Sequence, residues 1–134
     1  MIKYQSGYKY QLVNDYKIRT YVIPKESITS FWIELDNKGN LGLRLGYAWD
    51  GPSGPTIDTK NFMRGSLVHD ALYQLMRQGY LDIEWREQAD KELKRICLED
   101  GMSKIRAWWV YKAVRTFAKR CAEVSNKRKI LTAP

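Results

Sequence analysis

The feature of this sequence that most constrains its fold is a change in hydrophobic periodicity at a Gly- and Pro-rich segment, residues 50–58. Before this segment, aromatic and β-branched residues are dense and the periodicity is near two, which is typical of strands. After it, apolar residues recur at helical spacing. Strands followed by helices indicate an α+β fold.

The expected elements follow from this division. Strands are expected at residues 8–12, 16–23, 31–35 and 41–47, with a hairpin turn at 36–40. Helices are expected at about 61–78, 83–99 and 103–124. Gly79 and Gly101 suit C-terminal stops, and Asp82 and Ser103 suit N-caps. We predict an N-terminal antiparallel sheet of three or four strands followed by three helices, the first two of which form an antiparallel pair.

The chain of 134 residues suits one domain, which we place at residues 1–124, followed by a basic C-terminal tail at 125–134. No apolar stretch approaches the ~20 residues that span a bilayer, and the N-terminal residues lack the apolar core of a secretory signal. We therefore expect synthesis in the cytosol. Two cysteines, Cys97 and Cys121, make neither a disulfide framework nor a four-cysteine zinc site, so both are expected to be buried thiols.

The net charge is concentrated in the C-terminal third. Residues 101–134 contain nine Lys and Arg against Glu123 alone, so they carry the whole formal charge of +8. One face of the third expected helix interleaves cations with aromatic rings, and the residues predicted there to bind an anionic partner are Lys104, Trp108, Lys112, Arg115 and Lys119. Such a face suits an anionic phospholipid surface. It would also suit single-stranded nucleic acid, a neighbouring subunit of a virion, or water alone.

His69 is the only histidine, and helical spacing places it on an apolar stripe, so its imidazole is expected to face inward. The same spacing places Asp90 on the core face of the second helix, where a carboxylate needs a partner. In an antiparallel pair of helices the nearest candidate is His69. A carboxylate that bonds one ring nitrogen fixes the tautomer and leaves the other nitrogen as a base, although a buried structural hydrogen bond would look the same.

Asp70 lies at the rim of the His69 stripe, where its carboxylate can point toward the Gly/Pro loop. A Gly-rich loop can turn several carbonyl oxygens toward one point, and carbonyls with one carboxylate are the hard oxygen ligands that calcium prefers. The ligands we predict are therefore Asp70 with loop residues Asp50, Gly51 and Gly54.

The run His69-Asp70-Ala-Leu-Tyr73, preceded by the Gly/Pro loop and followed by Ala89-Asp90, resembles the active site of phospholipase A2. The resemblance implies that His69 activates water, Asp90 orients it and Tyr73 supports the dyad. It implies that Asp70 binds calcium with loop carbonyls, and that calcium stabilises the oxyanion. The paired cysteines that precede the histidine in the secreted enzymes are here Gly65 and Ser66.

A second resemblance covers about residues 44–118. The pattern D-x-x-S-x-P, formed by Asp50, Ser53 and Pro55, followed by the H-D-x-x-Y motif, is similar to a family of small phage and prophage proteins catalogued as a domain of unknown function. It implies a phage or prophage origin, and hence a location in the host cytoplasm or in the virion.

Three function classes are compatible with these features. The first is a phage-encoded, calcium-dependent phospholipase-A2-like esterase that acts on phospholipid esters at a bacterial membrane during entry or lysis. The second is a non-catalytic phage structural or host-factor-binding protein, such as a tail or neck component, that retains the fold. The third, nucleic-acid binding through the basic C-terminal helix, ranks last because no nucleic-acid motif is present.

Overall fold

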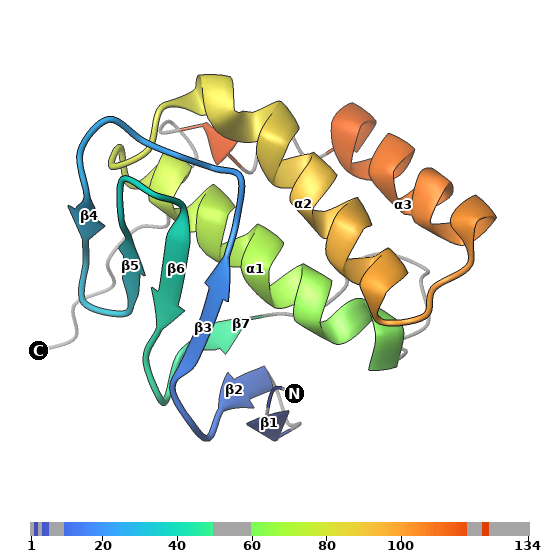
Figure 1. The fold of residues 1–134 in the computed structure, drawn as a ribbon, viewed down its shortest axis with the longest axis horizontal. Helices are drawn as coiled ribbons and strands as arrows, with labels where there is room; N and C mark the ends of the chain where they lie inside the picture. Colours follow the sequence, from blue (N-terminus) through green and yellow to red (C-terminus); the bar gives the residue numbers. More distant parts are fainter. Residues whose placement is uncertain (1, 3, 6–9, 50–59, 118–121, 124–134) are drawn as a thin grey trace, which may run out of the picture.

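The computed structural model describes residues 2, 4–5, 10–49, 60–117 and 122–123 (Figure 1). Within them, strands come first and three helices follow. One antiparallel sheet has the order β1-β2-β7, with β1 at Tyr4–Gln5, β2 at Tyr10–Leu12 and β7 at Ala48–Trp49. A second has the order β3-β6-β5-β4, with β3 at Tyr16–Arg19, β6 at Asn40–Leu43, β5 at Ile33–Leu35 and β4 at Ile28–Thr29. The predicted α+β fold class is confirmed.

The four-stranded sheet has one apolar face, which packs on the helices. Alternate side chains of its two central strands are buried, namely Ile33, Leu35, Leu41 and Leu43. The other face carries exposed side chains such as Lys17 and Glu34. This alternation is what a half-buried antiparallel sheet requires, and it explains the near-two periodicity of the sequence.

The turn predicted at residues 36–40 joins β5 to β6. The Asp36 carboxylate accepts hydrogen bonds from the backbone N–H groups of Lys38 and Asn40, each at 2.9 Å. Gly39 has φ +89°, and a Cβ built there would lie 2.2 Å from the carbonyl oxygen of Thr20. Only glycine fits this position, since both the backbone conformation and the close approach exclude a side chain.

The helices are α1 at Lys60–Arg77, α2 at Arg86–Glu99 and α3 at Lys104–Phe117, with a 3₁₀ turn at Ile83–Trp85 before α2. Gly79 and Gly101, with φ +79° and +96°, follow α1 and α2 as predicted. Asp82 caps the 3₁₀ turn by accepting from the N–H of Glu84, and the Ser103 hydroxyl accepts from the N–H of Arg106. The segment 125–134, predicted as a tail, lies outside the described residues.

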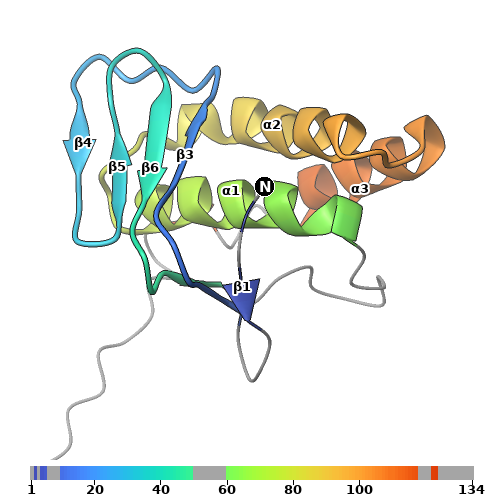
Figure 2. The ribbon, with the colours of Figure 1, turned by 60° about the horizontal axis from the view of Figure 1, so that its bottom comes forward.

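Helix α1 is the centre of the molecule. The four-stranded sheet lies against one side of it, α2 runs antiparallel along another, and α3 packs beyond α2 (Figures 1 and 2). Twelve of its 18 residues are buried, His69 among them. A smaller apolar cluster joins all three helices and consists of Phe62, Leu93, Cys97, Met102, Ala107 and Val110. Within the described residues, no helix is long and apolar enough to cross a bilayer.

Candidate active site

His69 and Asp90 meet between α1 and α2. The Nε2 atom of His69 lies 2.7 Å from Oδ1 of Asp90, a hydrogen bond between two buried groups. His69 is 6% exposed and Asp90 is 0% exposed. The pairing predicted from helical spacing is confirmed, because the two helices run antiparallel and place the middle of α1 beside the start of α2 (Figure 1).

Tyr73 lies one turn after His69 and joins the same carboxylate. Its hydroxyl donates to Oδ1 of Asp90 at 2.5 Å, and its ring centroid lies 4.2 Å from that of His69. Burial, reinforced by the hydrogen bond to Asp90, raises the pKa of Tyr73 well above its usual range. The hydroxyl therefore stays protonated and serves as a donor to Asp90.

Arg115 of α3 supplies a third donor to Asp90. Its Nη1 lies 2.9 Å from Oδ2 of Asp90. The sequence pattern predicted Arg115 on an outward cationic face, but in the structure its side chain points toward α2 and is 30% exposed. The physical reason is the fully buried carboxylate, which needs a cation to balance its charge. The sequence signal for this contact was the isolated Asp90 on an apolar helix face, although the sequence alone does not say which cation pairs with it.

The three donors decide the charge of Asp90. Burial alone would raise the pKa of Asp90, but the hydrogen bonds from His69, Tyr73 and Arg115 outweigh burial and hold that pKa below its usual range. Asp90 is therefore a carboxylate at neutral pH, and its Oδ1 accepts a hydrogen bond from Nε2–H of His69. In the neutral tautomer that results, the lone pair resides on Nδ1. Among the described residues, none forms a hydrogen bond with Nδ1 of His69. Nδ1 is therefore the ring nitrogen that is able to accept a proton.

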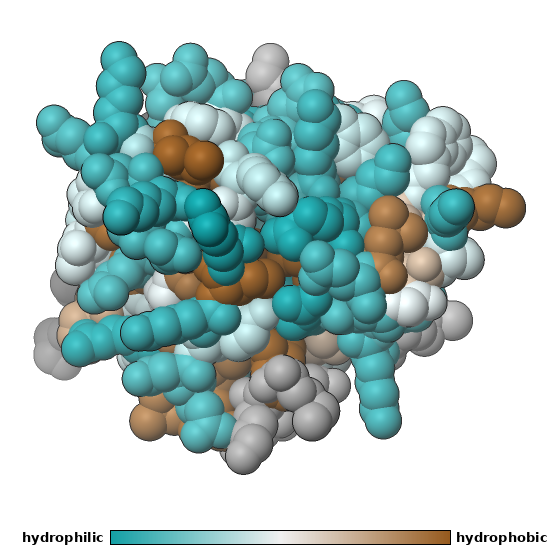
Figure 3. All heavy atoms as spheres, viewed as in Figure 1, coloured by the Kyte–Doolittle hydropathy of each residue, from teal (hydrophilic) through white to brown (hydrophobic). Residues whose placement is uncertain are grey.

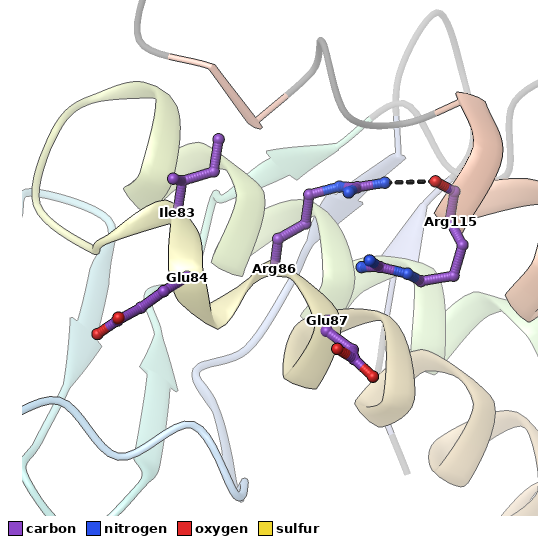
Figure 4. Close-up of a pocket in the computed structure, with 5 residues that line it drawn as sticks. All are labelled: Ile83, Glu84, Arg86, Glu87 and Arg115. Atoms are coloured by element: carbon purple, nitrogen blue, oxygen red, sulfur yellow. Dashed lines mark hydrogen bonds between the residues drawn. The ribbon is translucent and has the colours of Figure 1, made fainter.

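A pocket of about 260 Å³ lies beside this cluster, at the start of α2 (Figure 4). Its lining residues are Ile83, Glu84, Arg86, Glu87 and Arg115. Nη2 of Arg86 donates to the backbone carbonyl oxygen of Arg115 at 2.6 Å, which ties α2 to α3. The Arg115 guanidinium thus belongs both to the pocket wall and to the contacts of Asp90.

The predicted calcium ligands are only partly described. Asp70 is half-buried and directly follows His69 on α1, whereas Asp50, Gly51 and Gly54 lie outside the described residues. Among the residues that are described, no three His, Cys, Asp or Glu side chains come together as a metal site. One carboxylate suits a hard cation, but loop carbonyls would have to supply the remaining oxygen ligands. The calcium site stays a prediction.

The predicted anion-binding residues separate into two groups. Lys104, Trp108 and Lys112 are exposed on α3, whereas Arg115 faces Asp90. Lys119 lies outside the described residues.

A second buried carboxylate, Glu92 of α2, was not predicted from the sequence. It accepts a hydrogen bond from the backbone N–H of Tyr21, and its Oε2 lies 2.6 Å from Nε of Arg95. Glu92 is 0% exposed, so these contacts attach the segment after β3 to α2. An acid three residues before Arg95 looks like an ordinary surface ion pair in sequence, which is why nothing there indicated burial.

Comparison with known proteins found no match: no family model, no curated protein and no solved structure resembles this chain at a significant level. The geometry around Asp90 is therefore the basis for inferring function.

Proposed function

We propose that this protein is a phage-encoded, phospholipase-A2-like esterase that hydrolyses phospholipid esters at a bacterial membrane during entry or lysis. The observation that carries the proposal is the His69–Asp90–Tyr73 cluster, in which one carboxylate oxygen accepts from both Nε2 and the tyrosine hydroxyl. A histidine whose tautomer is held in this way has the arrangement of a general base.

In the proposed reaction, Nδ1 of His69 removes a proton from a water molecule as the water oxygen attacks the ester carbonyl carbon. Asp90 stabilises the imidazolium that forms, and Tyr73 keeps the Asp90 carboxylate in place. Collapse of the tetrahedral intermediate breaks the ester C–O bond, and the imidazolium returns the proton to the departing alkoxide. The products are a fatty acid and a lysophospholipid.

Calcium belongs to the proposal through Asp70. Bound there with loop carbonyls, it would polarise the ester carbonyl and stabilise the oxyanion. Asp70 directly follows His69, so a calcium ion bound by Asp70 would lie near the proposed base.

The test is fatty-acid release from vesicles of ester-linked phosphatidylglycerol, with millimolar calcium or with a chelator. The native chain is expected to release fatty acid only with calcium. His69→Ala should lose this activity, whereas the control Gln78→Ala, near the end of α1, should retain it. Unchanged hydrolysis in a folded His69→Ala variant, or no hydrolysis by the native chain, would contradict the proposal.

A second candidate is the non-catalytic phage structural or host-factor-binding protein. It is favoured by the complete burial of Asp90 and by the ion pair with Arg115, since such a cluster also suits a structural centre that holds three helices together. In this case His69→Ala lowers stability, and no vesicle hydrolysis is found in the native chain.

A further inference from the structure

Helix α3 exposes an apolar surface that nothing in the described chain covers. Ile105, Trp108 and Trp109 are 74%, 44% and 63% exposed. Their spacing of three and four residues puts them on one side of the helix. The two indole rings touch edge to face, with centroids 5.0 Å apart. In Figure 3, pale and brown side chains reach the surface over α3 among hydrophilic neighbours.

These side chains are not needed for packing of α3 within the domain. The opposite side of the helix is anchored by Ala107 and Val110, which are buried against α2, with Val114 packed beside them. A partner that covers these neighbouring tryptophans removes apolar surface from water without disturbing the packing inside the domain. Such an exposed apolar patch marks an interaction surface.

The surroundings of the patch are cationic. Lys104 and Lys112 are exposed on the same helix, and Nζ of Lys112 lies 5.5 Å from the ring centroid of Trp108. The α3 sequence contains no Asp or Glu. The complementary partner therefore combines negative charge with an apolar layer just below it, which is the chemistry of an anionic lipid surface.

Arg115 lies on the same helix, two turns after Trp108, and its guanidinium donates a hydrogen bond to Asp90. A partner seated on Ile105 and the two tryptophans is thus attached to the helix that completes the contacts of the proposed site.

We propose that the exposed side of α3, formed by Ile105, Trp108 and Trp109 with Lys104 and Lys112, docks onto an anionic phospholipid bilayer. The rings enter the headgroup region and the two lysines meet phosphates. This inference deepens the proposed function, because it names the surface by which the esterase reaches its lipid, but it makes a separate claim about binding.

The experiment measures co-sedimentation of the full chain with vesicles of ether-linked lipids, which an esterase cannot hydrolyse. Native protein is expected to bind ether-linked phosphatidylglycerol at least about tenfold more tightly than ether-linked phosphatidylcholine. The double variant Trp108→Ala/Trp109→Ala should lose about tenfold or more in affinity for the anionic vesicles. The matched control is Phe31→Ala, which removes a ring that is 67% exposed on the sheet side of the molecule and should bind as the native chain does.

Equal binding by the folded double variant would overturn the docking proposal, as would equal affinity for the two lipids or no vesicle binding at all. A single-stranded oligonucleotide that displaces the protein from vesicles and binds more tightly through the same tryptophans would assign the surface to nucleic acid and overturn it as well. Vesicle binding by the native chain without hydrolysis of ester-linked lipid would instead contradict the proposed esterase activity and leave the docking proposal standing.

Discussion

Asp90 determines the chemistry of the site because it is a fully buried charge with three separate donors. His69 and Tyr73 share one of its oxygens, and Arg115 takes the other. A carboxylate in this position is stable only while its donors remain, so each of them contributes to folding as well as to any reaction.

Replacing Asp90 with Asn is expected to lower the free energy of unfolding at pH 7 by roughly 1 to 3 kcal/mol, since the charge-assisted hydrogen bonds to the carboxylate become bonds to a neutral amide. The folded pKa of Asp90 is depressed, so its contribution is complete above the ordinary Asp pKa of about 4 and is lost as pH falls through the folded value. Urea unfolding at a series of pH values from 7 to 3 should show the free energy of unfolding of the native chain falling toward that of the variant. A constant difference in stability over that range would contradict the depressed pKa of Asp90. The control variant is Glu34→Gln, which changes an exposed carboxylate.

Burial, assisted by the charge of Asp100, raises the pKa of the Cys97 thiol to about 12. At pH 8 its thiolate population is then about a thousandfold below that of an unperturbed thiol, so labelling by iodoacetamide should be correspondingly slow. Peptide mapping separates Cys97 from Cys121, and labelling in urea should restore the ordinary rate. Rapid labelling of Cys97 in the native chain would show that the contact between α1 and α2 opens readily.

At the scale of elements, the helices were predictable and the short strands were not. Apolar spacing and the stops at Gly79 and Gly101 placed all three helices within a few residues of their observed starts. The strands β4 and β7 contain two residues each, too few to show a periodicity. The outward face of α3 was predicted correctly for Lys104, Trp108 and Lys112, which are exposed. The place of Arg115 was beyond the sequence, since only its bond to the buried Asp90 carboxylate distinguishes it from the other cations.

Helices α1 and α2 approach closely at Gly65. A Cβ built there would lie 2.8 Å from Sγ of Cys97 and 3.0 Å from Cδ1 of Leu93. Gly65→Ala should therefore push the helices apart, cost roughly 1 to 3 kcal/mol, and weaken the contact between His69 and Asp90 one turn away.

The measurements are urea unfolding and the NMR signal of the His69 ring. The matched control is Gly101→Ala, where a Cβ meets nothing within 4 Å but φ is +96°. It should cost roughly 1 to 2 kcal/mol from backbone strain alone and leave the His69 signal unchanged. A Gly65→Ala variant as stable as the native chain would show that the two helices separate without penalty.

At the scale of the whole molecule, the buried core and the exposed lysines of α3 lie in different layers. The four-stranded sheet and α1 enclose the core, while α3 forms an outer layer beyond α2 (Figures 1 and 2). Exposed tryptophans and lysines lie on this outer helix. The C-terminal third carries the entire formal charge of +8. This arrangement would orient the protein toward an anionic surface before any specific contact forms.

Association with anionic vesicles should therefore weaken as sodium chloride rises from about 0.05 to about 0.5 M, because salt screens exposed lysines. Part of the affinity should persist, since insertion of Trp108 and Trp109 does not depend on charge. Co-sedimentation across a salt series measures both parts. Binding that does not change with salt would show that the charge asymmetry plays no role in docking.

The proposal that the His69 imidazole is a working base is tested most directly by fatty-acid release from ester-linked phosphatidylglycerol vesicles with calcium, with native chain and His69→Ala compared at equal vesicle binding. The expected result is release by the native chain and none by the folded variant. Equal release by both, or none by either, would mean that the contact of His69 with Asp90 holds the helices together and catalyses nothing.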